Sequence, residues 1–170
     1  MIQAHFIGRK ITSNTQEAFT LQDSSCFGEK SGEYVEYSPI EALFLVKENK
    51  MDVYSGKKSI SFSSLLVKVR KEDKKIETKL SAFSDLRKKG YIVKTALKFG
   101  AEFRVYEKGV KPGEDHARWI LYTASEHESS NWHDFAAKNR VAHATKKNLL
   151  IAIVDDEGDV SYYEIRWMRP

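Results

Sequence analysis

The sequence predicts a mixed α/β (α+β) fold, with a small N-terminal mixed α/β domain followed by a C-terminal domain whose helices flank a central mixed β-sheet. Three observations support this prediction. Short strand-like and helix-like runs alternate in the first half of the chain. Leu149 to Val154 are six consecutive apolar residues, which is typical of a strand buried on both faces of a sheet. Helical patterns that end near Gly90 and begin near Asn131 can cover such a sheet.

The composition indicates an ordinary water-soluble chain. Its 170 residues, 41% hydrophobic and 31% charged, suffice for one large domain or two small ones. A net charge of +4 makes a nucleic acid a plausible partner without requiring one. The single cysteine, Cys26, excludes an internal disulfide and fits a reducing, cytoplasmic compartment. No apolar run reaches the ~20 residues of a membrane span, and the N-terminus has no signal-peptide pattern, so no membrane association is expected.

The first 49 residues predict three strands and one helix. Turn-forming residues separate strand-like runs, which are Ala4 to Ile7, Ala18 to Leu21 and Tyr34 to Tyr37. Ser38 can then accept free N–H groups of a first helical turn, and proline is tolerated at the next position. Glu41 can reach back to Ser38 and complete a capping box. The helix that follows should end near Asn49.

The middle of the chain predicts a strand and a long helical stretch. Met51 to Tyr54 reads as a strand, and Ser61 to Val69 as a helix. The charged run 70–79 is interpreted as a solvated helix surface. Apolar residues then recur at helical spacing and continue the helix to Lys89, before Gly90; they are Ile76, Leu80, Phe83 and Leu86. The domain division is placed in this region, giving domains 1–78 and 79–170.

The second half predicts a more regular order of elements. Its expected strands are Tyr91 to Leu97, Phe103 to Tyr106, Arg118 to Thr123, Leu149 to Val154 and Val160 to Trp167. A helix capped by Asn131 should run to about Lys147. An acidic turn, residues 155–159, separates the last two strands.

The helix expected from Asn131 carries a row of cations. Seven residues nearly close two helical turns, so Arg140 and Lys147 would point the same way, about 10 Å apart. With His143 between them, such a row would suit a phosphate backbone. The alternative is a solvated basic face near a helix C-terminus, where the helix dipole favours cations.

Three stretches resemble the catalytic domain of the archaeal tRNA-splicing endonucleases. They are GYIVKTALKFGAEFRVYEKG, PGEDHARWIL and RVAHATKKNLLIAIVDDEGDVSYYEI, within a resemblance that runs from about Leu80 to Pro170. The first half fits the family's N-terminal domain by length and position. The resemblance implies a C-terminal nuclease domain that cleaves precursor tRNA at the intron boundaries of a bulge–helix–bulge element. Cleavage by attack of the 2′-OH, without metal or cofactor, would leave a 2′,3′-cyclic phosphate and a 5′-hydroxyl.

The resemblance also implies a catalytic tyrosine, histidine and lysine, which fall on Tyr106, His116 and Lys147. Two lysines stand in the HATKKN motif, and the offset of four from His143 favours Lys147 over Lys146. His116 can act as the acid on the leaving group, and Lys147 can stabilise the charged transition state. Tyr106 has a reference pKa of ~10, so either nearby cations, Lys147 and Arg104, lower that pKa or Tyr106 mainly orients the hydroxyl.

The resemblance also implies how the chain binds RNA and how it assembles. Two arginines hold a bulged base, and Arg140 and Arg166 match them here, although Trp167 and Arg169 lie close to Arg166. The acidic turn would join two dimers into a homotetramer through four carboxylates, which are Asp155, Asp156, Glu157 and Asp159. The last strand would pair with its own copy across a two-fold axis. A heterotetramer with a second type of chain is the alternative.

Two other functions remain open from the sequence. The chain could be a non-catalytic structural subunit of such an endonuclease, although the full set of three residues favours catalysis. It could also be a metal-dependent nuclease that uses Glu102 and Asp115, since paired carboxylates hold magnesium. His5, His127 and His133 lack metal-ligand spacing, so no zinc site is expected.

Overall fold

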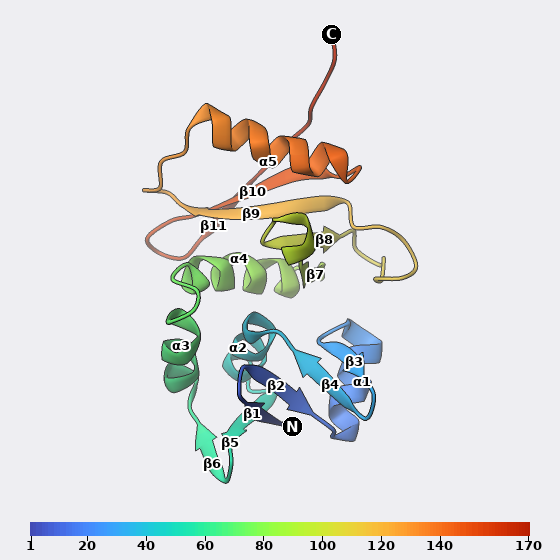
Figure 1. Ribbon diagram of the computed structural model, residues 1–170, viewed down its shortest axis with the longest axis vertical. Coiled ribbons are helices and arrows are strands. Elements are labelled where there is room, and N and C mark those ends of the chain that lie inside the picture. Colours follow the sequence, from blue (N-terminus) through green and yellow to red (C-terminus); the bar gives the residue numbers. More distant parts are fainter. The chain divides into compact units, whose positions relative to one another are not determined.

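The computed structural model describes all residues from Met1 to Pro170 and confirms the mixed α/β class. The chain forms an N-terminal unit, Met1–Leu80, and a C-terminal unit, Ser81–Pro170 (Figure 1). Each unit contains one β-sheet with its own helices. The two units divide after residue 80, two residues beyond the predicted division. No helix has both the length and the apolar character that a membrane crossing requires.

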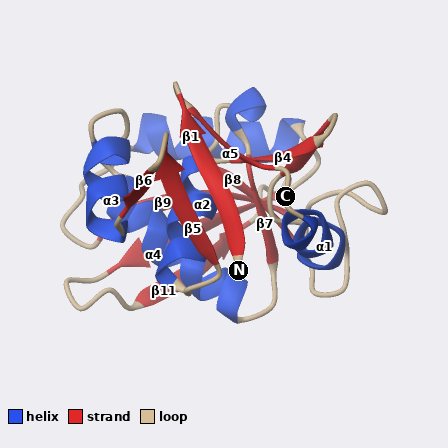
Figure 2. Cartoon of the chain, turned by 90° about the horizontal axis from the view of Figure 1, so that it is seen from below, coloured by secondary structure: helices blue, strands red, loops and turns tan.

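The N-terminal unit is built on a six-stranded sheet of order β3-β4-β2-β1-β5-β6. Its strands are β1 (Ile2–Ile7), β2 (Lys10–Ser13), β3 (Glu29–Ser31), β4 (Tyr34–Tyr37), β5 (Met51–Ser55) and β6 (Lys58–Ile60). Strands β1 and β5 pair in parallel, and they lie side by side in Figure 2. Its helices are α1 (Gln16–Ser25), α2 (Pro39–Lys47) and α3 (Phe62–Arg70).

The strand predicted over Ala18 to Leu21 is wrong, because these residues lie within helix α1. The fully buried residue of this helix is Ala18, and Leu21, Gln22 and Ser25 are half-buried. This spacing of three, four and seven residues is the period of a helix. A run of four residues is too short to show which period applies.

The predicted capping box at the start of α2 is confirmed. Ser38 Oγ accepts the N–H of Glu41 at 3.4 Å, and the Glu41 carboxylate accepts the N–H of Ser38 at 3.0 Å. Glu41 is buried and also accepts the N–H of Gly28 at 3.0 Å. A Cβ at Gly28 would lie 2.5 Å from a Val35 methyl carbon, so only glycine fits here. One carboxylate therefore joins the helix start to the loop before β3.

The single helix predicted from Ser61 to Lys89 is wrong, because a turn divides it into α3 and α4 (Ile76–Lys88). The Asp73 carboxylate accepts the N–H of Lys75 at 3.0 Å and pairs with Lys79 at 2.7 Å. An aspartate that bonds its own local backbone competes with the helical hydrogen bonds and starts a new helix. Gly90, with φ of +91°, follows the end of α4 as predicted.

The C-terminal unit contains a five-stranded sheet of order β11-β10-β9-β8-β7. Its strands are β7 (Ile92–Thr95), β8 (Phe103–Tyr106), β9 (Trp119–Ser125), β10 (Asn148–Val154) and β11 (Val160–Ile165). Only β9 and β10 pair in parallel, and helix α5 (Trp132–Ala144) connects them. Helices α5 and α4 cover opposite faces of this sheet (Figure 1). Alternate residues of β9 and β10 therefore enter different cores, with Ile120 and Leu149 packed near Ala142 of α5.

Several boundaries in this unit differ from the prediction by one to three residues. The first strand ends at Thr95, because a 3₁₀ turn, η1 (Leu97–Phe99), follows it. The last strand ends at Ile165 and not at Trp167. Helix α5 ends at Ala144 and not at Lys147, because Lys146 takes a left-handed backbone with φ of +56°. Asn131 caps α5 as predicted, accepting the N–H of Asp134 at 2.8 Å.

Candidate active site

Three segments that are separate in the sequence meet at one end of the strands of the C-terminal sheet. Tyr106 is the last residue of β8, which runs antiparallel to β9. His116 lies three residues before β9, and Lys147 lies directly before β10. Because β9 and β10 are parallel, with Trp119 opposite Asn148, both strands begin at the same edge. The end of β8 and the starts of β9 and β10 therefore meet there.

The residues between β8 and β9 form a loop that returns to the strand edge. Gly113, with φ of +95°, allows the turn that the sequence predicted at Pro112-Gly113. The Asp115 carboxylate accepts the N–H of His116 at 2.6 Å. The N–H of Arg118 then bonds the carbonyl of Val105 at 3.0 Å and starts the pairing of β9 with β8. This loop holds His116 beside the end of β8.

Lys147 reaches the same edge because α5 stops short of it. The row of Arg140, His143 and Lys147 on one helical face is therefore wrong. The N–H of Lys147 bonds the carbonyl of Ala142 at 2.8 Å, and its amine donates to the carbonyl of Thr145 at 2.9 Å. These two bonds turn the chain from the helix end into β10.

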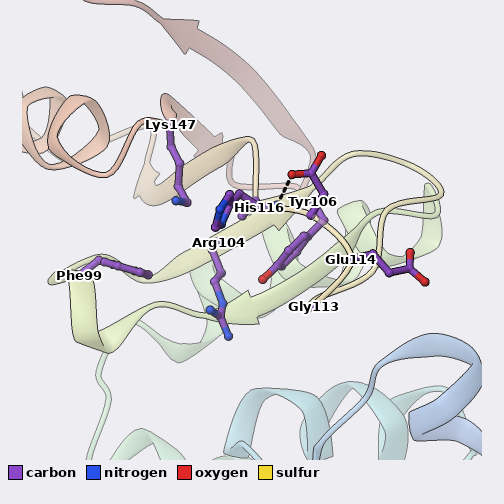
Figure 3. Close-up of a pocket in the computed structure, with 9 residues that line it drawn as sticks. Phe99, Arg104, Tyr106, Gly113, Glu114, His116 and Lys147 are labelled. Atoms are coloured by element: carbon purple, nitrogen blue, oxygen red, sulfur yellow. Dashed lines mark hydrogen bonds between the residues drawn. The ribbon is translucent and has the colours of Figure 1, made fainter.

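Tyr106, His116 and Lys147 line one pocket of about 340 Å³ (Figure 3). The other residues lining it are Phe99, Arg104, Gly113, Glu114, Asp115 and Ala117. Tyr106 is buried, and Lys147 is half-buried with its amine 5.5 Å from the centre of the Phe99 ring. Phe99 and Glu114 were not predicted as site residues, since a single aromatic or acidic residue in a turn carries no distinguishing pattern.

The pocket alters the proton affinity of Lys147. Burial lowers the pKa of its amine, and the positive charge of Arg104 lowers that pKa further. Both effects disfavour the protonated amine. An anion bound in the pocket would favour the protonated amine and would therefore act against both effects.

Arg140 and Arg166 lie outside this pocket. Arg140 is exposed on α5, and Arg166 follows β11 with its Nε donating to Glu164. The Trp119 indole N–H also donates to Glu164, and this bond is the main cause of the lowered pKa of that carboxyl. The ring of Trp167 lies 4.5 Å from that of His143, one helical turn beyond Arg140. The region flanking Arg140 therefore contains an exposed aromatic side chain as well as cations.

The acidic turn between β10 and β11 is exposed and internally hydrogen-bonded. Asp155 accepts the N–H groups of Glu157 and Asp159, both at 2.9 Å. Asp156 contacts the His127 ring at 3.1 Å, and this hydrogen bond is the main cause of the raised pKa of His127. Ligand atoms of Glu126, His127 and Asp156 lie within 4.8 Å of one another. All three are exposed and outside the pocket, and exposed carboxylates gather at many protein surfaces without a metal ion.

Glu102 and Asp115, the pair considered for a metal-dependent nuclease, do not share a pocket. The Glu102 carboxylate accepts the N–H and the hydroxyl of Thr123, at 2.6 and 2.7 Å. Asp115 lines the pocket, whereas Glu102 does not. The structure therefore provides no joint site for this pair.

Comparisons with known proteins agree with both units. The N-terminal domain of the tRNA intron endonucleases matches residues 2–66, and their catalytic C-terminal domain matches residues 76–162. A tRNA-splicing endonuclease of Thermococcus onnurineus is 37% identical over 169 residues, 99% of this chain and 97% of that protein. Those of Nanoarchaeum equitans and Methanothermobacter thermautotrophicus are 40% and 37% identical, over 77% and 92% of this chain and 88% and 91% of those proteins.

The two matched domains define an endonuclease that acts on tRNA. The chain belongs to the tRNA intron endonuclease family. This confirms the family resemblance found in the sequence.

The lowered pKa of Lys147 predicts early reaction with an amine-acylating reagent. Labelling of Lys147 is measured by mass spectrometry over a range of pH. It should begin at a lower pH than labelling of an ordinary lysine, because less of the Lys147 amine is protonated at a given pH. Arg104→Gln removes the second cause and should move the rise to higher pH. Arg87→Gln, at a half-buried arginine outside the pocket, should leave it in place. An unchanged profile in Arg104→Gln would contradict the assigned cause.

Proposed function

We propose that this chain cleaves precursor tRNA at the bulge–helix–bulge elements of intron boundaries without a metal ion. The observation that carries the proposal is the shared pocket of Tyr106, His116 and Lys147 at one sheet edge. The family membership supplies the substrate class, and the relatives that match over the whole chain are named tRNA-splicing endonucleases. The enzyme would act where tRNA is processed, in the cytoplasm.

In the proposed reaction the 2′-oxygen attacks the adjacent phosphorus, and the bond from phosphorus to the 5′-oxygen breaks. The 2′-OH loses a proton and the 5′-oxygen gains one, so the products are a 2′,3′-cyclic phosphate and a 5′-hydroxyl. This chemistry needs a base, an acid and positive charge on the developing oxyanion. A metal is not required when side chains supply all three.

Each of the three side chains fits one of these tasks. His116 stands on the loop that borders the pocket and would protonate the leaving 5′-oxygen. Lys147, whose amine is anchored to the Thr145 carbonyl, would stabilise the charge on phosphorus-bound oxygens. Tyr106 would hold or deprotonate the 2′-OH. The guanidinium of Arg104 lies 6.0 Å from the centre of the Tyr106 ring.

The RNA-binding assignment of Arg140 and Arg166 belongs to the same proposal. Both are exposed, so a base can approach the planes of their guanidinium groups. The Nε of Arg166 donates a hydrogen bond to Glu164. The ring of the adjacent Trp167 lies next to that of His143.

A bulge–helix–bulge has two cleavage sites, so at least two copies of the pocket must be held together. We propose a homotetramer, a dimer of dimers. β11 is an edge strand of the sheet and is free to pair with its own copy. The carboxylates of the acidic turn, the half-buried Asp155 and the exposed Asp156, Glu157 and Asp159, would then dock on a basic surface of a neighbouring subunit. A non-catalytic role is less well supported, because the chain contains the full set of three pocket residues.

The reaction proposal predicts the behaviour of a His116→Ala variant. Its single-turnover cleavage of a bulge–helix–bulge RNA should fall about 10²- to 10⁴-fold, the usual weight of a general acid. RNA affinity should stay within twofold, because the imidazole acts on the transition state. His5→Gln, at an exposed histidine of the N-terminal unit, is the matched control and should cleave like wild type.

The wild-type reaction should proceed in excess EDTA and leave 2′,3′-cyclic phosphate ends. Products with a 5′-phosphate and a 3′-hydroxyl, or full activity in His116→Ala, would contradict the mechanism.

The assembly proposal predicts that charge reversal in the acidic turn leaves dimers. Asp156→Lys with Glu157→Lys is the preferred variant, because Asp155 holds the turn through its hydrogen bonds. Light scattering should give a tetramer mass for wild type and half that mass for the variant, with cleavage lost. Glu29→Lys with Glu33→Lys, two exposed carboxylates elsewhere, should remain tetrameric. An active wild type of monomer or dimer mass would refute the tetramer.

A further inference from the structure

We propose that Arg104 is a second phosphate-binding cation of the pocket, and that its guanidinium contacts a non-bridging oxygen of the RNA phosphate beside Lys147. This proposal rests on the proposed function for the identity of the phosphate. The observation that carries it is a half-buried guanidinium with no carboxylate partner, in the same pocket as Tyr106, His116 and Lys147.

The strand geometry directs Arg104 to this pocket. Arg104 and Tyr106 stand two residues apart on β8, so their side chains leave the same face of the strand. Strand β8 pairs with β7 on one side and β9 on the other, with Lys94 and Ile120 opposite Arg104. This pairing fixes the backbone of Arg104. Figure 3 shows its side chain on the pocket wall with those of Tyr106 and His116.

The charge of Arg104 is not balanced within the chain. Its Nε is buried and has no hydrogen-bond partner. Four other arginines of the chain pair with carboxylates; they are Arg9 with Glu72, Arg70 with Glu77, Arg118 with Glu107 and Arg166 with Glu164. A partly desolvated cation without a partner costs free energy. Such a cost is consistent with a group whose partner arrives with the substrate.

The acidic residues of the pocket do not supply the missing charge. Glu114 accepts the N–H of Lys111 at 3.3 Å, and Asp115 accepts the N–H of His116 at 2.6 Å. Both are exposed and bonded to the backbone of their own loop. Neither forms an ion pair with Arg104 or Lys147.

Two uncompensated cations in one pocket select an anion. Arg104 and Lys147 repel each other, as the lowered pKa of the Lys147 amine reflects. A phosphate between them would relieve this repulsion. A planar guanidinium offers two parallel N–H groups to two phosphate oxygens, whereas an amine acts as a point charge. Arg104 would therefore orient the phosphate for attack, and Lys147 would add charge on the developing oxyanion.

Binding of inorganic phosphate tests this proposal without relying on RNA cleavage. Isothermal titration should show phosphate binding to the wild type, weakened about ten- to a hundredfold in Arg104→Gln. Arg104→Lys should restore part of the phosphate affinity, because lysine keeps the positive charge but lacks the two parallel N–H groups of the guanidinium. Arg87→Gln is the matched control, since Arg87 is also half-buried with a buried Nε but lies outside the pocket. Circular dichroism would establish that each variant is folded.

Single-turnover cleavage with phosphorothioate substrates supplies the second arm. Replacing one non-bridging oxygen of the scissile phosphate with sulfur should slow the wild type more than it slows Arg104→Gln, because the variant has already lost that contact. Equal sulfur effects in both proteins would show that Arg104 acts only through Tyr106 and would overturn the proposal. Absent phosphate binding in wild type, or equal binding by Arg104→Gln, would also overturn it. Arg104-dependent phosphate binding without any RNA cleavage would instead retain the anion site and refute the proposed function.

Discussion

The parallel pairing of β9 with β10 is the constraint on which the candidate site depends. Asn148 lies opposite Trp119, so the segments that enter these two strands, with Lys147 and His116, stand at one edge of the sheet. The antiparallel strand β8 ends at the same edge with Tyr106. Helix α5 makes this pairing possible, because a parallel connection needs a crossover that packs on the sheet. A shift of this register by one residue would separate the three side chains.

The charge balance of the pocket complements this geometry. The carboxylates of the rim are bonded to their own loop, while Arg104 and Lys147 face the same space without acidic partners. A folded protein normally pairs or hydrates such cations, since desolvation disfavours them. Here the unpaired charge would slightly lower the stability of the protein without RNA and would favour the binding of a phosphodiester.

Sequence patterns predicted those parts of the fold that are decided locally. The capping residues Ser38 and Glu41 and the apolar strand from Leu149 to Val154 are read from neighbouring residues alone. Ala18 to Leu21 was mistaken for a strand, because four residues fit both periods. The end of α5 was placed too late, because the left-handed backbone of Lys146 has no glycine to signal it. The family resemblance selected Tyr106, His116 and Lys147, but their meeting in one pocket depends on strand pairing that no local pattern contains.

The central claim is that the pocket cleaves RNA through the RNA's own 2′-hydroxyl. The most direct measurement uses a bulge–helix–bulge RNA with a single 2′-deoxy nucleotide immediately before one scissile phosphate, assayed with wild-type protein in EDTA. The unmodified site of the same molecule is the internal control. The account predicts cleavage at the unmodified site and none at the deoxy site, with RNA affinity unchanged. Cleavage at both sites would contradict it, because a nucleophile other than the 2′-OH would then be at work.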